Sequence, residues 1–254
     1  MKRVAGMTIG EVAIVLVILA VMAAILFPVF AKAGEYSGPG PYSNPKQIGL
    51  AMLQYAEDNE QMLPPRQSYS GPNHELVSWR SMIYPYLRSN NVYESRENAA
   101  AKEPDLERDT YHRSYAVNST TVAKLGASGP FSDVYGGTSR IKDIPNPATV
   151  ALLTETTAAY NDINVTLPEA FTAKFVPGQN RGALFMSKRF HVSAYLFADG
   201  HVRGYAPLQT RNVDGKNLWT RDNSTFSPIE NAKVNKVLQY AEDHFEEMQR
   251  KRDG

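Results

Sequence analysis

The N-terminal stretch MKRVAGMTIGEVAIVLVILAVMAAILFPVFAKA, residues 1–33, decides the organisation of this chain. From Val12 to Ala31 it is an unbroken apolar run without a charged side chain. As a helix, a run of about 20 residues is about 30 Å long, the thickness of a bilayer's hydrocarbon core. Lys2 and Arg3 precede the run, and flanking positive charge stays on the cytoplasmic side. We therefore expect one membrane-spanning helix, with the rest of the chain outside the cytoplasm.

The composition limits what lies beyond this run. The chain has 254 residues and a formal net charge of +1. Because no strong positive field exists to attract nucleic acid, nucleic acid is not expected as a partner. Mean hydropathy is −0.38, which predicts a polar, soluble body after the apolar run. The sequence contains no cysteine, which excludes disulfides, cysteine-ligated zinc, iron–sulfur clusters and thiol catalysis.

Glu11 stands at the cytoplasmic end of the apolar run. A carboxylate near hydrocarbon costs about 2–3 kcal/mol unless it is paired or reaches the interface. One interpretation is that Glu11 marks the interface where the span begins. The other depends on cleavage between Gly6 and Met7, which would create an amine four residues before Glu11. The carboxylate would then pair with this amine of a neighbouring subunit and set the register of a helical array.

The basic leader that ends in Gly6, followed by x-T-x-x-E and a long apolar helix, resembles the type IV prepilin class, which includes type II secretion pseudopilins. The resemblance implies a prepilin peptidase that cuts after Gly6 and methylates the amine of Met7. It also implies an assembly role for Glu11 and a helix kink at Pro28. The expected location is the bacterial inner membrane, spanned once, with an extracytoplasmic head that becomes periplasmic or extracellular in a homo-oligomeric filament.

Later segments resemble one branch of this class, the bacterial prepilin-like proteins with an H-x9-DG element. These segments are FPVFAKA (27–33), SNPKQIGLAMLQYAEDNEQMLPP (43–65), Trp79 with YPYL (84–87), SYAVN (114–118) and LFADGHV (196–202). The chain also departs from the branch. Arg189 occupies the position of the family histidine, with His191 two residues later, and Pro41 and Glu94 stand where relatives often carry a cysteine pair.

The implied fold class is α+β and pilin-like: a long N-terminal transmembrane helix, a head in which a helix packs on an antiparallel β-sheet, and an extra C-terminal helix. The chain divides accordingly into a leader (1–6), a transmembrane and assembly helix (7–33), a hinge (34–45), a globular head (46–226) and a C-terminal amphipathic helix (227–254). The hinge, GEYSGPGPYSNP, has three prolines and three glycines, which no helix sustains.

A helix is predicted to begin directly after the hinge. Asn44 is a suitable N-cap, Pro45 suits the first helical position, and Gln47 completes a capping-box pattern. One apolar stripe at helical spacing is expected to face a sheet: Ile48, Ala51, Met52, Tyr55 and Ala56. The helix should end at Leu63, because two prolines follow it.

The best strand signal surrounds Asp199 and Gly200. Asp-Gly between two β-rich runs predicts a hairpin with a type I′ turn, in which both turn residues have positive φ. Asp199 and His201 are also candidate metal ligands, but adjacent hairpin residues should point to different faces and no third ligand is spaced nearby, so no metal site is predicted. Two further strands are predicted at Ser114–Asn118 and Thr149–Thr154.

The C-terminal helix carries its own start signal, a capping box formed by Ser227 and Glu230 with Pro228 at the first helical position. The motif LQYAED occurs in it at 238–243 and also at 53–58. Amphipathic patterning limits residue choice, so the repeat is explained by two core-facing helices of similar composition. The alternative is that the C-terminal helix docks on the head like, or in place of, a neighbour's helix.

Catalysis is not predicted. The histidines are scattered, and the sequence has no HExxH, GxSxG or phosphate-loop motif. No cofactor is expected, although some pseudopilins bind calcium in a head loop. Asp133 and Asp143 flank a glycine-rich loop here, but without EF-hand spacing.

Three hypotheses for function follow. The first is a structural subunit of a type IV pilus-like or type II secretion pseudopilus filament. The second is a solitary membrane-anchored or secreted extracytoplasmic binding module, for which exposed tyrosines would provide contacts. The third, an exported enzyme, needs converging polar side chains that the sequence does not reveal. A separate alternative concerns processing, because Ala31-Lys32-Ala33 is an A-x-A site at which an ordinary signal peptidase would cut before Gly34.

Overall fold

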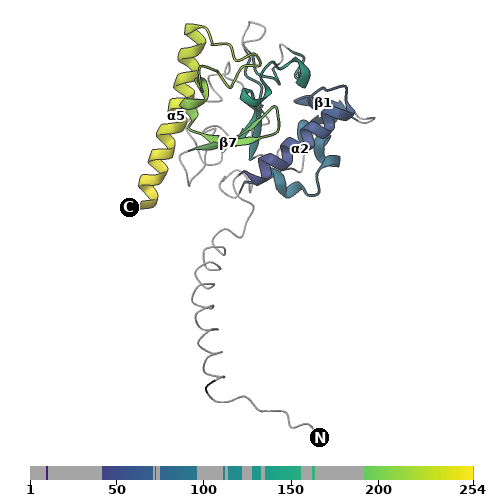
Figure 1. Cartoon of the computed structure of the whole chain (residues 1–254), viewed down its shortest axis with the longest axis horizontal. Helices are drawn as coiled ribbons and strands as arrows, with labels where there is room; N and C mark the ends of the chain where they lie inside the picture. The colour runs from purple at the N-terminus through teal and green to yellow at the C-terminus, as the bar shows by residue number, and fades with distance from the viewer. Residues whose placement is uncertain are drawn as a thin grey trace. The chain divides into compact units, whose positions relative to one another are not determined.

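The computed structural model divides the chain into two compact units, Met1–Gly40 and Pro41–Gly254. It describes residues 10, 42–70, 72, 75–95, 111, 114–121, 128–132, 135–155, 162–163 and 192–253. The second unit contains two main helices, α2 and α5, and the strands β1–β7 (Figure 1). The boundary between the units falls inside the predicted hinge, and the C-terminal helix belongs to the same unit as the head.

The principal sheet has five strands in the order β5-β3-β4-β6-β7. All its neighbouring strands are antiparallel except β5 and β3, which are parallel. The predicted strands at Ser114–Asn118 and Thr149–Thr154 correspond to β3 and β4. The strands of this sheet are β3 (Tyr115–Asn118), β4 (Ala151–Glu155), β5 (Asp162–Ile163), β6 (Ser193–Phe197) and β7 (Val202–Tyr205).

Short elements complete the head. A separate two-stranded antiparallel hairpin precedes a short helix, and several 3₁₀ turns connect the longer elements. These elements are β1 (Gln67–Ser70), β2 (Glu75–Ser78), α3 (Trp79–Ile83), η1 (Tyr84–Tyr86), η2 (Asn90–Tyr93), η5 (Ile141–Asp143), η6 (Pro147–Thr149) and η7 (Pro207–Arg211).

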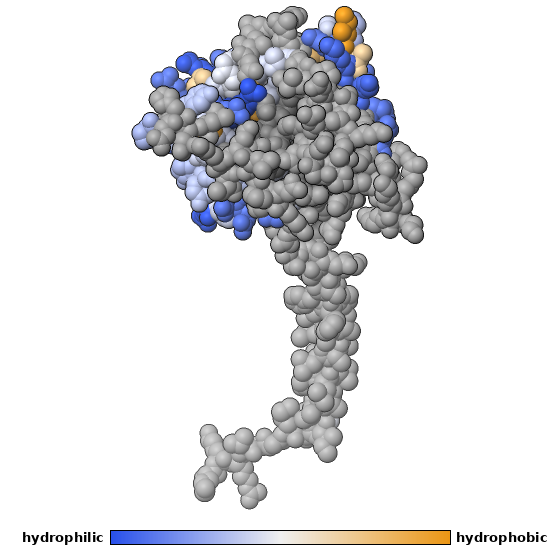
Figure 2. Space-filling view, turned by 180° about the vertical axis from the view of Figure 1, so that it is seen from behind, coloured by the Kyte–Doolittle hydropathy of each residue, from blue (hydrophilic) through white to orange (hydrophobic). Residues whose placement is uncertain are grey.

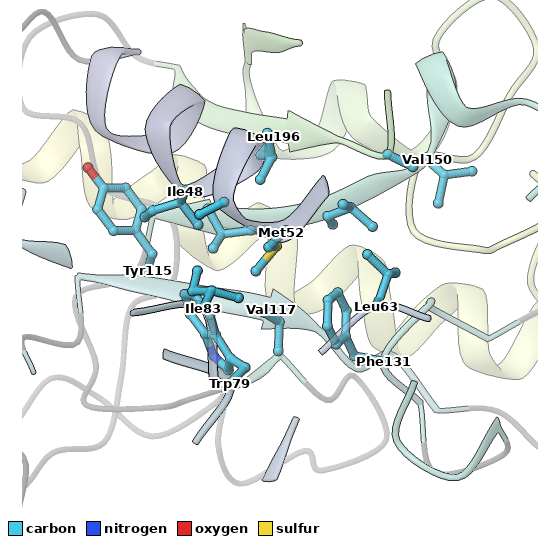
Figure 3. Packing of buried hydrophobic residues seen from close by; sticks show 14 of the residues in the cluster. Ile48, Met52, Leu63, Trp79, Ile83, Tyr115, Val117, Phe131, Val150 and Leu196 are labelled. Atoms are coloured by element: carbon cyan, nitrogen blue, oxygen red, sulfur yellow. The ribbon is translucent and has the colours of Figure 1, made fainter. Parts of the chain in front are cut away.

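The main hydrophobic core lies between α2 (Ser43–Asp58) and one face of the principal sheet. Figure 3 shows Ile48 and Met52 of α2 directed toward Leu196 of β6 and Val117 of β3. The helix approaches β6 closely at Gly49, where an added Cβ would lie 2.4 Å from Cδ1 of Leu196. A side chain at this position would therefore require the Leu196 side chain or the helix to shift.

α2 begins differently from the prediction. It starts at Ser43, and its N-cap is Tyr42, which makes no side-chain capping hydrogen bond. The predicted cap by Asn44 is therefore wrong. The Asn44 side chain has a different partner, because its Nδ2 donates to the carbonyl oxygen of Glu94 at 2.8 Å.

α2 also ends earlier than predicted, at Asp58. Glu60 and Gln61 have φ values of +52° and +64°, which a right-handed helix cannot include. This turn brings Leu63, which is fully buried, into the core, where its N–H donates to the carbonyl oxygen of Ser139 at 2.9 Å. The end of α2 is thus set by a contact with a distant loop and not by the prolines that follow Leu63.

The opposite face of the sheet is covered by the C-terminal part of the chain. Side chains alternate between the two faces of a strand, and Tyr195 of β6 points away from α2 and meets Trp219, with ring centroids 6.0 Å apart. α5 (Pro228–Asp253) lies on this side, so α2 and α5 occupy opposite faces of the sheet (Figure 1). Val234 and Leu238 of α5 are buried on this side.

Candidate functional site

The residues on which the filament hypothesis depends lie outside the described residues. These are Gly6 and Met7 at the expected processing site, Glu11 at the expected assembly site, and Pro28 at the expected kink. Within the part of the chain that is described, no helix is long and apolar enough to cross a membrane. The sites described below therefore all lie in the head.

The chain turns between β6 and β7 at Ala198–His201, which includes the predicted Asp199 and Gly200. The N–H of Phe197 donates to the carbonyl oxygen of His201, and the N–H of Gly200 donates to that of Phe197, both at 2.9 Å. Of the two predicted turn residues only Gly200 has a positive φ, +85°. The connection is therefore longer than a two-residue type I′ turn, and that prediction is wrong.

Gly200 is also required by packing. A Cβ at this position would lie 2.8 Å from Cδ1 of Leu53 on α2. Both the left-handed backbone and this close approach favour glycine. The Asp199-Gly200 element thus places the β6–β7 connection against α2.

The side chains of Asp199 and His201 meet at this connection. Asp199 Oδ1 lies 2.5 Å from His201 Nδ1 and also accepts the backbone N–H of His201 at 3.1 Å. The His201 ring stacks on Phe197, with centroids 4.3 Å apart and planes 3° apart. The expectation that the two side chains point to different faces is wrong, because both residues lie in the loop, where strand alternation does not apply.

Chemically, these contacts fix the His201 ring. Carboxylate, backbone and ring stacking hold its orientation, which is the arrangement of a structural turn. A metal would need at least a third ligand, and the described residues contain no group of three or more histidine, aspartate or glutamate side chains that could hold one. Of the two calcium candidates, Asp143 lies exposed in η5 and Asp133 lies outside the described residues.

The type I′ geometry occurs at a second Asp-Gly pair. Asp214 and Gly215 have φ values of +52° and +79°. Val213 and Lys216 exchange two backbone hydrogen bonds across them, at 2.9 and 3.0 Å. The same dipeptide signal marked this turn in the sequence, and sequence reasoning missed it because the flanking residues are not β-rich.

A buried polar cluster holds the start of α2 to the sheet, and sequence reasoning also missed it. The Ser95 hydroxyl donates to Oε1 of Glu155 at 3.1 Å, and Oε2 of Glu155 accepts the N–H of Ala194 at 3.3 Å. Tyr115 lies beside this carboxylate. Burial, and secondly the negative charge of Glu155, raise the pKa of Tyr115 well above its usual value, while hydrogen bonds from Ser95 and Asn44 act in the opposite direction.

This cluster lies at the point where the chain enters the head. Asn44 is in the first turn of α2, and its partners Glu94 and Tyr115 belong to the segment after η2 and to β3. Buried hydrogen-bond networks of this kind fix one arrangement, because breaking a single member leaves the others without partners. The first residues of the head are therefore held firmly against its central strands.

The C-terminal layer is attached by polar contacts as well. The Arg211 guanidinium at the end of η7 donates to the side-chain oxygens of Asn231 and Asn235 on α5. Burial lowers the pKa of Arg211. Two turns further along α5, Glu242 Oε1 accepts the N–H of Leu208 at 2.8 Å and so caps the start of η7.

The two LQYAED copies are used differently. In α2, Ala56 is buried, Glu57 is exposed, and Asp58 accepts the Tyr86 hydroxyl at 2.8 Å. In α5, Leu238 is buried and Glu242, the counterpart of Glu57, bonds η7 within the same chain. This difference favours the interpretation of the repeat as a shared helix composition.

The comparisons with known proteins bear on the first part of the head. A family model described as a protein of unknown function (DUF1559) matches residues 42–123. The match covers about a third of the chain and includes α2, α3 and β3. No curated protein and no solved structure matches the chain.

Proposed function

We propose that this chain is a structural subunit of a type IV pilus-like or type II secretion pseudopilus filament. It is made as a precursor with a cytoplasmic leader, held by one span in a bacterial inner membrane, and cut after Gly6 by a prepilin peptidase. Its partners are that peptidase, membrane lipid and other pilin or pseudopilin subunits.

The observation that carries the proposal is the position of Glu11. It is the charge at the cytoplasmic end of the apolar run, and it would be the fifth residue of a chain that begins at Met7. A carboxylate near hydrocarbon is tolerated when a partner neutralises it, and the new amine of a neighbouring subunit is such a partner. Each added subunit would then be held in register by one ion pair, while its apolar helix exchanges lipid contacts for helix contacts.

The architecture of the head supports the proposal. A head carried on a filament must keep its own fold when the subunit is pulled. Here the first helix of the head packs on the principal sheet at Gly49, and the Asn44 and Tyr115 contacts fasten its first turn. A head whose first helix is fixed to its own sheet in this way suits a subunit carried on a filament.

Substitution of Glu11 tests the proposal. We expect Glu11→Ala and Glu11→Leu to insert into the membrane and to be cut after Gly6, because the leader and the apolar run are unchanged. We expect both to lose assembly, with filament material reduced to background when sheared or ultracentrifuged fractions are compared. Asp143→Ala, which removes an exposed carboxylate in the head, is the matched control and should assemble like the parent chain.

The alternative function is a solitary anchored or secreted binding module. The observation that favours it is the set of tyrosines with exposed rings, since tyrosine is common at binding surfaces. Tyr69 is 70% exposed, Tyr84 42% and Tyr42 40%. Normal incorporation of the Glu11 variants into filaments would reject the assembly role of Glu11. The failure of the parent chain to form filaments would favour this alternative over the filament subunit.

A further inference from the structure

The two main helices of the head each present one exposed apolar residue followed by charge. On α2, Leu50 is 52% exposed, and Glu57 is exposed seven residues later. On α5, Ile229 is 73% exposed, the highest value among the exposed large hydrophobic residues of the described part, and Lys236 is exposed seven residues later. Figure 2 shows that the coloured surface on this side is mostly hydrophilic, with a small apolar patch at its upper edge.

The spacing of the two stripes is the same. Residues i, i+4 and i+7 share one face of a helix, and seven residues span about 10.5 Å. If the two helices lie side by side and parallel, three pairs come opposite each other: an apolar pair, a polar pair and an acid–base pair. The pairs are Leu50 with Ile229, Gln54 with Lys233, and Glu57 with Lys236.

These stripes cannot meet within one head. α2 and α5 lie on opposite faces of the principal sheet, and each buries its other side against that sheet or its adjoining layer (Figure 1). Any contact between the stripes therefore joins two molecules. Because the two surfaces differ, the contact is head-to-tail and leaves a free stripe at each end, which is the type of contact that builds open helical assemblies.

We propose that the exposed stripe of α2 (Leu50, Gln54, Glu57) binds the exposed stripe of α5 (Ile229, Lys233, Lys236) of a second copy of this chain. The inference rests on the proposed filament function and assigns it a contact between heads. A single helix pair buries less surface than a stable complex needs. The contact is therefore weak between isolated heads and becomes effective when the stems hold the heads at high local concentration.

The absence of cysteine from the chain makes a direct test available. The full-length double variant Leu50→Cys/Ile229→Cys, in membranes of expressing bacteria, is treated with copper phenanthroline and run on a non-reducing gel. Each chain then carries one thiol on each stripe, so we expect a ladder of dimers, trimers and larger species. The register control is Leu50→Cys/Lys236→Cys, which is displaced by about 10.5 Å along α5 and should give little ladder, since a disulfide needs Cα atoms within about 7 Å.

Charge reversal gives a second readout. In the Leu50→Cys/Ile229→Cys background, Glu57→Lys places two positive charges opposite each other and should reduce the ladder about threefold or more. Adding Lys236→Glu restores an acid–base pair and should recover it. All substituted residues are exposed, so an unchanged melting temperature is expected for each variant.

The outcomes separate this inference from the proposed function. Glu11-dependent assembly with a ladder no stronger than that of the register control overturns the helix contact and leaves the filament function standing. A ladder that Glu57→Lys does not weaken also overturns the proposed register. If chains that keep Glu11 neither assemble nor give a ladder, both the filament function and the helix contact are overturned.

Discussion

Gly49 is a residue at which helix α2 packs closely against the principal sheet. An added methyl would lie 2.4 Å from Cδ1 of Leu196, which is itself fully buried. We expect Gly49→Ala to lower the free energy of unfolding by about 1–3 kcal/mol, because overpacking costs more than the gain in helix propensity. The measurement is thermal unfolding of the full chain in detergent, followed by circular dichroism.

The matched control for Gly49→Ala is Gln54→Ala on the exposed side of α2. It should change the free energy of unfolding by less than about 0.5 kcal/mol. If Gly49→Ala is as stable as this control, α2 does not approach β6 as closely as described.

Two buried tyrosines predict a loss of stability in alkali. Burial raises the pKa of both Tyr115 and Tyr195 above the usual value of 10. The unfolded chain therefore loses these protons first as the pH rises through 10, and the folded state loses stability from there upward. We expect the free energy of unfolding to fall by about 1.4 kcal/mol per pH unit for each tyrosine that stays protonated.

The measurement is denaturant unfolding between pH 9 and pH 11.5, with Tyr195→Phe as the comparison. The variant removes the hydroxyl and keeps the ring, so the decline above pH 10 should become shallower by the contribution of one tyrosine. An equal slope for the parent and Tyr195→Phe would contradict the assignment of this effect to Tyr195.

At the residue scale, sequence patterns located special positions better than they assigned their roles. Asn44 has the chemistry of a cap, but its side chain instead donates a hydrogen bond to the carbonyl oxygen of Glu94 in a distant segment. Asp199 and Gly200 do lie in the β6–β7 connection, but the packing of Leu53 and the longer turn determine its geometry. Competition between local and long-range partners is invisible in a single sequence.

At the scale of the element, α5 depends on the cap at its start. The Ser227 hydroxyl donates to Oε2 of Glu230 at 2.8 Å and accepts the N–H of Glu230 at 3.4 Å. We expect Ser227→Ala to cost about 1 kcal/mol, and Ser227→Thr, which keeps the hydroxyl, to cost much less. Hydrogen exchange of the first turn of α5 is the measurement, and equal protection in both variants would show that the cap contributes nothing.

Elements with a strong local signal were predictable from the sequence. The capping box at Ser227, the helical stripe after Pro45 and the predicted strand at Thr149–Thr154 all correspond to elements in the structure. Element ends were less predictable. α2 stops at Asp58 because Leu63 must reach the core and the Ser139 carbonyl, and this requirement comes from a residue far along the chain.

At the scale of the whole molecule, the head has helices on both sides of one sheet. The sequence indicated the α2 side through its apolar stripe, but it did not indicate that Trp219, η7 and α5 form a second covering layer. That layer is held by polar contacts such as the hydrogen bond from Arg211 to Asn231. Such contacts leave no periodic pattern in the sequence from which they could be predicted. The buried Ser95 and Glu155 pair escaped prediction for the same reason.

The proposed filament role depends on the N-terminal residues. Their pattern lies within a short stretch of the chain, so it can be recognised in the sequence. Gly6, Met7 and Glu11 lie within a six-residue stretch, and the chemistry proposed for them needs only cleavage and a neighbour. The head adds a firmly packed first helix and the two stripes. The most direct test therefore concerns where the mature chain begins.

That measurement is N-terminal sequencing, with intact mass, of the protein recovered from cells that assemble it. The account predicts a chain that begins at Met7 and carries a methylated amine, so that Glu11 is its fifth residue. A chain that begins at Gly34 would follow the ordinary signal-peptidase route and lack Glu11 altogether, and a chain that keeps residues 1–6 would have no new amine to pair with it. Either result would contradict the filament account.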